Sequence, residues 1–182
     1  RRPEDEVSVL MELFVRALHD EELRLKENDI RLSVIGERSA LPVRLQDAIA
    51  RAEANTADCR GLHLNVAANY GGQWDLVQAA KSLAAATASG ALDPATIDEA
   101  SFNARLALGA APPVDLLIRT GGERRISNFL LWQLAYSELY FTDTLWPDFD
   151  HAALDAALAW YAGRERRFGR TSEQVQIGGA SA

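Results

Sequence analysis

The chain has 182 residues, of which 48% are hydrophobic and 25% are charged, enough for one domain with a sizeable core. The 26 acidic and 19 basic residues give a net charge of −7, which argues against a broad surface for nucleic acid or for an anionic membrane. Cys59 is the single cysteine, so no internal disulfide can form, and cytoplasmic residence fits. No apolar run approaches a membrane span. The first residue is not Met, which indicates processing or a piece of a longer protein.

The first predicted element is a helix that starts at Pro3. Proline suits the first helical position, and the acidic residues 4–6 favour the positive end of the helix dipole. Its apolar residues fall on one narrow arc, with a second apolar wall beside it, so we expect burial on two sides. The arc comprises Val7, Leu10, Met11, Phe14, Leu18 and Leu25, and the second wall comprises Val9, Leu13 and Ala17.

The rest of the chain alternates strands and helices. Hydrophobic spacing predicts strands at 30–35, 62–68, 114–118 and 139–141, and helices at 42–57, 73–86, 127–135 and 150–166, with a short helix after Asp93-Pro94. This alternation is typical of a parallel sheet with crossover helices. We therefore expect an α/β fold with a mostly parallel central sheet flanked by helices on both faces. A single domain would cover residues 1–170, and residues 171–182 would form a flexible tail.

The loop after the third predicted strand carries the strongest chemical signal. Ligands of parallel α/β sheets bind at the carboxyl edge of the strands, and two glycines here let the backbone approach a ligand. Arg119, Arg124 and Arg125 supply guanidinium groups. Ser127 and Asn128 suit the N-cap of the next predicted helix, whose first amides would be free. Together these donors suit a phosphate or a diphosphate. A polar turn with solvated arginines is the alternative.

Glu138 lies just beyond that predicted helix and enters an apolar stretch. A carboxylate there costs free energy unless it is paired or bound to a metal. Mg2+ would satisfy it, with carboxylate and phosphate oxygens in its shell. An ion pair with a nearby arginine is the alternative that the residues themselves favour. The three histidines are scattered, so no structural zinc site is indicated.

Three stretches follow one another closely: RTGGERRISNFLLWQ at 119–133, AYSELYFTD at 135–143 and LWPDF at 145–149. They resemble the C-terminal signature of the cis-prenyltransferases, and most of all that of the bacterial undecaprenyl diphosphate synthases. Supporting segments occur in the same order, namely RP at 2–3, NVAANYGG at 65–72 and RERRFG at 164–169. The resemblance therefore covers nearly the whole chain, up to about Gly169.

The resemblance implies an activity and its partners. Members of this family condense isopentenyl diphosphate repeatedly onto an allylic diphosphate, usually farnesyl diphosphate, and make new cis double bonds. The expected product is a long-chain polyprenyl diphosphate, such as undecaprenyl diphosphate for the lipid carrier of cell-wall synthesis. Members are magnesium-dependent homodimers, so we expect Mg2+, both diphosphate substrates and a second subunit as partners. Nucleic acid is not an expected partner, and membrane association would be peripheral, through the product.

The resemblance also transfers roles onto individual residues. Glu138 matches a magnesium carboxylate. Arg124 stands where some members place a histidine near the metal, and because an arginine cannot ligate a cation, that role stays empty here. The C-terminal stretch matches one that reaches the active site of the partner subunit. The expected substrate-binding residues are Arg2, Arg119, Arg125, Ile126 and Ser127, and those of the partner-reaching tail are Arg167 and Gly169.

The growing prenyl chain is apolar and needs an apolar channel. The broad apolar face of the first helix, together with leucines of the second strand, is our candidate for its wall. The candidate residues are Leu10, Phe14, Leu25, Leu62 and Leu64. Ordinary core packing is the alternative for each of them.

The family's Asp-Gly-Asn loop, which binds the allylic diphosphate and supplies the essential Asp, is not in this sequence. The chain begins where the next loop of the family ends. We therefore expect the N-terminal strand to be missing from the sheet, no catalytic residue in this chain, and no activity of the chain alone. A non-catalytic partner subunit of a cis-prenyltransferase is the alternative. An unrelated α/β phosphatase would need a nucleophile elbow, which the sequence lacks.

Overall fold

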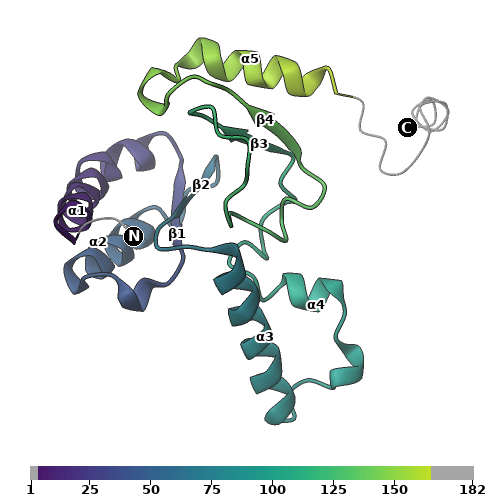
Figure 1. The fold of residues 1–182 in the computed structure, drawn as a ribbon. Coiled ribbons are helices and arrows are strands. Elements are labelled where there is room, and N and C mark those ends of the chain that lie inside the picture. Colours follow the sequence, from purple (N-terminus) through teal and green to yellow (C-terminus); the bar gives the residue numbers. More distant parts are fainter. Residues whose placement is uncertain (1–3, 165–182) are drawn as a thin grey trace. The chain divides into compact units, whose positions relative to one another are not determined.

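The computed structural model describes residues 4–164, with side chains described from residue 9 onward. Its helices are α1 (Glu4–Glu27), α2 (Val43–Asn55), α3 (Gly72–Ala88), α4 (Glu99–Asn103) and α5 (His151–Ala162), and its strands are β1 (Arg31–Ile35), β2 (His63–Ala67), β3 (Leu116–Arg119) and β4 (Glu138–Phe141) (Figure 1). Short 3-10 turns lie at Arg38–Ala40, Pro94–Thr96 and Trp146–Asp148. Arg2, Arg167, Gly169 and the predicted tail at 171–182 lie outside the described residues.

The chain divides into two compact units. The first unit comprises Arg1–Ala111 with Asn128–Leu130, and the second comprises Pro112–Ser127 with Leu131–Ala182. Each unit holds one parallel pair of strands, β1 with β2 and β3 with β4. The predicted α/β class with parallel strands is confirmed. The described strands pair two by two, one pair in each unit. Hydrophobic spacing could not predict these pairs, because it indicates that a segment is extended and carries no information on which strand lies beside it.

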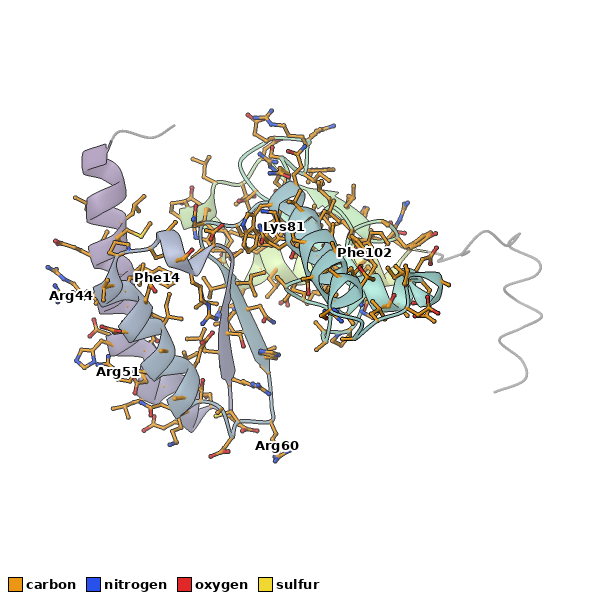
Figure 2. The ribbon with its side chains drawn as sticks, turned by 90° about the horizontal axis from the view of Figure 1, so that it is seen from below. Phe14, Arg44, Arg51, Arg60, Lys81 and Phe102 are labelled. Atoms are coloured by element: carbon orange, nitrogen blue, oxygen red, sulfur yellow. The ribbon has the colours of Figure 1, made fainter. Side chains whose placement is uncertain are left out.

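The core of the first unit lies between its sheet and the helices α1 and α2. Opposite residues Leu32 and Leu64, and Val34 and Val66, share one face of the sheet. Leu32 and Val34 are buried on that face with residues of α1 and α2. Figure 2 shows α1, with Phe14, beside α2, with Arg44 and Arg51. The buried cluster comprises Leu18, Leu32, Val34, Leu41, Leu45, Ala48, Ile49 and Ala52.

Helix α1 buries only one of its two predicted walls. Leu18 is buried, and the rest of the arc that is described, apart from Leu10, packs against the core. Val9 and Leu13 are more than half exposed, so the expectation of burial on two sides is wrong for these two positions. Their spacing reports an apolar face, whereas burial requires another element to cover it. No helix within residues 4–164 combines the length and the apolar character that crossing a bilayer would need.

Side chains from α2 and the residue after it cover the outer edge of β1. The Leu32 amide donates to Thr56 Oγ1 at 3.1 Å, and the Val34 amide donates to Glu53 Oε1 at 2.8 Å. Thr56 is fully buried, and its hydroxyl donates to the Ala52 carbonyl at 2.9 Å. Unpaired amides at the edge of a strand can pair with a further strand. The side chains of Thr56 and Glu53 prevent such pairing here, because they already bind the Leu32 and Val34 amides.

The second unit is built on β3 and β4. The register aligns Leu116 with Glu138 and Arg119 with Phe141. Helix α5 packs on β4 through Trp160, whose ring centroid lies 5.2 Å from that of Tyr140. The helix predicted at 150–166 ends at Ala162, with Gly163 as its C-cap residue, and residues 165 and 166 lie outside the described part of the chain.

The predicted helix at 127–135 is wrong. The structure has consecutive turns there, and Ser127, Asn128 and Leu130 have φ angles of 47°, 65° and 45°. Such left-handed residues cannot continue a right-handed helix. The apolar spacing of the segment comes from turn residues such as Leu130 and Leu134, which are buried without forming a helix.

We predict that Thr56→Val destabilises the chain by about 1–3 kcal/mol, because it leaves the Leu32 amide without its acceptor at a buried edge. Thr56→Ser keeps the hydroxyl and loses one methyl group, so it should cost only about 1 kcal/mol. Urea denaturation of both variants measures the difference. Equal stabilities of the two variants would contradict the role of the hydroxyl.

Candidate functional site

The loop after β3 is shaped by two glycines and two threonines. Gly121 and Gly122 have φ angles of 82° and 78°, a region that suits glycine. The Gly121 amide donates to the Thr144 carbonyl at 2.8 Å, and the Gly122 amide donates to the Thr142 carbonyl at 2.9 Å. Both amides are therefore engaged inside the loop. No helix begins at residue 127, so neither these two amides nor a helix start supplies the expected backbone donors, and the side chains of the loop are the candidate ligands for an anion.

Arg119, Arg125 and Ser127 come together in this loop. Arg119 is the last residue of β3, and its Nη1 donates to Ser127 Oγ at 3.0 Å and to the carbonyl of Arg125. A hydroxyl that accepts from a guanidinium can still donate its own hydrogen. The contact thus places a guanidinium and a hydroxyl donor side by side at the carboxyl end of a parallel strand, where such sheets bind ligands.

Arg125 is exposed and forms an ion pair with Glu123. Because both side chains are largely in water, the pair is weak and an anion of higher charge can compete for the guanidinium. Ile126 is half-buried between the two polar residues, and Arg124 is exposed. The predicted substrate-binding residues 119, 125, 126 and 127 therefore share one loop.

Glu138 lies at the other end of the same strand pair. It opens β4 opposite Leu116, three residues before Phe141, which pairs with Arg119. At a rise of about 3.3 Å per residue, the two ends are roughly 10 Å apart. The carboxylate accepts from Arg164 Nε at 3.2 Å, and the Arg164 guanidinium lies 5.1 Å from the Trp160 ring centroid. The structure therefore shows Glu138 in an ion pair with an arginine, which was the alternative to a bound metal.

The donor set around Glu138 bears on the expected metal. Within residues 4–164 there is no group of three or more His, Cys, Asp or Glu side chains that could hold a metal ion. Mg2+ usually keeps several waters and is bound by one or two carboxylates together with substrate phosphates. Glu138 therefore fits as a single protein ligand in such a shell, and it would have to exchange its ion pair with Arg164.

A structural role that the sequence did not reveal belongs to Asn128. The Gly72 amide donates to the Asn128 carbonyl at 2.6 Å, and the Gln73 amide donates to Asn128 Oδ1 at 2.8 Å. Asn128 thus caps the first turn of α3, rather than a helix of its own. Gly71, the N-cap residue of α3, has no side chain that could do so. Because a glycine has no side chain to accept from the first amides of a helix, a helix that begins with two glycines indicates that another segment of the chain supplies the cap.

The carboxyl edge of the first sheet is held by a hydrogen-bonded carboxylate. Glu37 follows β1 and accepts from Ser39 Oγ and from Trp74 Nε1, each at 2.6 Å. The Ser39 and Trp74 bonds lower the pKa of the Glu37 carboxyl, since they stabilise its ionised form. Trp74 belongs to α3, so this contact fixes the start of α3 against the end of β1.

The predicted channel residues fall into two groups. Phe14 and Leu25 pack against the buried cluster of the first unit. Leu10, Leu62 and Leu64 are 42%, 63% and 38% exposed. A cavity of about 700 Å3 lies between α1 and the start of α2, and none of the five candidates lines it. Leu10, Leu62 and Leu64 do not belong to the buried cluster, and that they line the channel stays a prediction.

Residues 1–169 match the family model described as "Putative undecaprenyl diphosphate synthase". The chain belongs to the cis-prenyltransferase family. The match takes in the loop with Arg119 and Ser127 as well as Glu138, so the resemblance read from the sequence is confirmed.

Relatives of known identity agree with this family. The chain is 54% identical over 176 residues to the ditrans,polycis-undecaprenyl-diphosphate synthase ((2E,6E)-farnesyl-diphosphate specific) of Vibrio cholerae, covering 97% of the chain and 70% of the relative. It is 57% identical over 178 residues to the isoprenyl transferase of Neisseria gonorrhoeae, covering 98% of the chain and 69% of the relative.

Solved structures of cis-prenyltransferases share the fold. Lavandulyl diphosphate synthase from Lavandula x intermedia, in complex with dimethylallyl diphosphate, superposes with a TM-score of 0.90 at 44% identity, covering 93% of the chain and 74% of that structure. A probable undecaprenyl diphosphate synthase from Campylobacter jejuni superposes with a TM-score of 0.80 at 32% identity, covering 93% and 77%. One fold thus occurs in synthases named for different products.

We predict that Glu138→Gln changes the free energy of unfolding by less than about 1 kcal/mol, because its ion pair with Arg164 is partly exposed. Glu22→Gln is the matched control, since Glu22 pairs with the exposed Arg51 on α2. Urea denaturation compares the two. A loss of more than about 2 kcal/mol for Glu138→Gln alone would show that the residue is needed for the fold rather than for a ligand.

Proposed function

We propose that this chain provides the isopentenyl diphosphate site of a cis-prenyltransferase. Such an enzyme would condense isopentenyl diphosphate onto farnesyl diphosphate and extend it to a long-chain product such as undecaprenyl diphosphate. The observation that carries the proposal is the contact of Arg119 with Ser127 beside Arg125, at the carboxyl end of β3. Support comes from the relative in Vibrio cholerae, whose name specifies farnesyl diphosphate.

The side chains of the loop account for diphosphate binding. Arg119 and Arg125 offer planar guanidinium groups, which match phosphate oxygens with paired hydrogen bonds. Ser127 adds a neutral donor from its hydroxyl. Arg125 leaves Glu123 when the diphosphate binds, because a diphosphate carries more charge than one carboxylate. The loop therefore fixes the diphosphate end of the substrate and leaves its isopentenyl group to be oriented by apolar contacts.

Charge is also the central problem of the reaction. Pyrophosphate must leave as the allylic C–O bond breaks, and cations that offset its charge lower the barrier. Mg2+ would supply this Lewis-acid stabilisation when bound, and Glu138 is the residue of this chain that would hold it. We propose a homodimer in the cytoplasm as the working form, with Arg2, Arg167 and Gly169 contributing to substrate binding.

We predict that the chain binds isopentenyl diphosphate, and that Arg119→Ala weakens binding at least about tenfold, because a charge-assisted hydrogen bond is lost. Isothermal titration calorimetry of the chain with isopentenyl diphosphate measures this. Arg60→Ala is the matched control, since Arg60 is an exposed arginine just before β2 (Figure 2). Equal affinities of all three proteins, or no binding by the unsubstituted chain, would contradict the proposed site.

We predict that Leu62 limits product length. Leu62→Ala should give longer products and Leu62→Trp shorter ones, because Leu62 is exposed and would line the channel of the growing chain. Product lengths are compared by chromatography in an enzyme that carries this chain and elongates prenyl diphosphates. Leu23→Ala is the control, since Leu23 is an exposed leucine outside the proposed channel. Unchanged lengths for both Leu62 variants would refute the channel role of this position.

A further inference from the structure

The two strands of the first unit carry polar side chains on one of their faces. In the register of β1 and β2, Arg31 lies opposite His63, and Ser33 lies opposite Asn65. Because side chains alternate between the two faces of a strand, these four lie on the face opposite to that of the buried Leu32. Parallel strands are usually covered on both faces and apolar on both. Core packing therefore does not explain the polar side chains of this face.

A cavity of about 460 Å3 lies against this face. Arg31, Ser33, His63 and Asn65 all line it, and residues from the segment 107–111 form another part of its wall. Every lining residue belongs to the first unit, so the cavity is a feature of that unit alone. Its volume falls within the range of roughly 300–1,000 Å3 that is typical of sites for small molecules.

The polar part of the wall is rich in hydrogen-bond donors. Ser33 Oγ lies 2.8 Å from His63 Nε2, and this hydrogen bond holds the hydroxyl and the imidazole ring beside each other. Within residues 4–164, the side chains of Arg31 and Asn65 are not engaged by another residue. A guanidinium and an amide that are open to a ligand, next to a hydroxyl and an imidazole, suit the oxygens of a phosphate group.

The charge of the cavity also favours an anion. The lining residues with a full charge at neutral pH are Arg31, Arg38 and Glu53. Arg38 and Glu53 form an ion pair with each other, so their charges offset one another. Arg31 therefore leaves the cavity with one net positive charge, in a chain whose net charge is −7. A charged donor of this kind makes stronger hydrogen bonds to phosphate than a neutral one does.

We propose that this cavity binds a small phosphate monoester, whose phosphate group contacts Arg31 and Asn65 beside the Ser33–His63 pair. The organic part of the ligand follows from the size and the lining of the cavity. A free phosphate ion would fill only a small part of it, and Leu108 and Ala107 offer apolar contacts to a larger molecule. The site does not involve the loop after β3, so it goes beyond the function proposed above.

The histidines of the chain allow a test with internal controls. Phenyl phosphate is added to the full chain at constant pH and ionic strength, and the imidazole signals are followed by NMR. The signal of His63 should shift along a saturation curve. His19 on α1 and His151 on α5 should not respond, because neither lines the cavity. Equal shifts of all three histidines, or no shift of His63, would overturn the proposal.

Substitutions test the predicted contacts, with the affinity for phenyl phosphate measured by calorimetry. Arg31→Ala should weaken binding at least about tenfold, because a charge-assisted hydrogen bond is lost. Arg44→Ala is the matched control, since Arg44 is an exposed arginine of α2 that does not line this cavity (Figure 2). If Arg31→Ala fails to fold, Asn65→Ala decides, with an expected loss of about threefold for one neutral hydrogen bond. Affinities equal to that of the unsubstituted chain would contradict the site.

Inorganic phosphate distinguishes an ester from the free ion. Phenyl phosphate should bind at least about threefold more tightly, because its ring buries apolar surface against Leu108. Equal or tighter binding of inorganic phosphate would indicate a site for the free ion and overturn the assignment of a monoester.

Arg119→Ala separates this inference from the proposed function. The His63 shift should be unchanged in this variant, since Arg119 does not line the cavity. Loss of the His63 shift in Arg119→Ala would overturn the proposal, because the cavity of the first unit would then not bind the ester by itself. If His63 responds to phenyl phosphate but the chain does not bind isopentenyl diphosphate, the cavity site stands and the proposed function fails.

Discussion

The left-handed backbone that begins at Ser127 is the constraint on which the candidate site depends. It prevents a helix from forming after β3, although the apolar spacing of residues 127–135 favours one. In place of the helix, Asn128 becomes the cap of α3, and the Ser127 hydroxyl meets Arg119. The Asn128 carbonyl, which a helix at 127–135 would have used for its own hydrogen bonds, is thereby available to accept from the amide of Gly72.

The anion site that we propose draws on the side chains of the loop. In many phosphate sites, the amides of a glycine loop or of a helix start bind the ligand. Here the amides of Gly121 and Gly122 hold the loop against Thr144 and Thr142, so the glycines shape the loop and the arginines carry the charge. In the proposed site, specificity for a diphosphate would rest on two guanidinium groups, and the guanidinium of Arg125 is already paired with Glu123.

Local patterns located most elements within one to three residues. Regular spacing placed β1, α2 and α3, because one face of each packs on a core and leaves a period in the sequence. The short helix predicted after Asp93-Pro94 is present as the 3-10 turn Pro94–Thr96, which Asp93 caps. Helix α4, which follows it, was not predicted, although Asp98 and Ser101 form a capping box there, because its five residues are too few for a period. The loop arginines could be predicted as a group, since a β3 carboxyl end brings them together. The partner of Glu138 was open, because Arg164 is 26 residues away in sequence.

The sequence by itself determined the family, the α/β class and the loop that holds the candidate diphosphate site, because these are written in contiguous motifs and in the spacing of apolar residues. Only the tertiary structure decided which strands pair, that Glu138 and Arg119 lie at opposite ends of one strand pair, and that Asn128 caps α3. The physical reason is that each of these rests on contacts between residues far apart in the chain. Such contacts depend on the backbone conformation of a few residues, and this conformation cannot be predicted from composition or from hydrophobic periodicity.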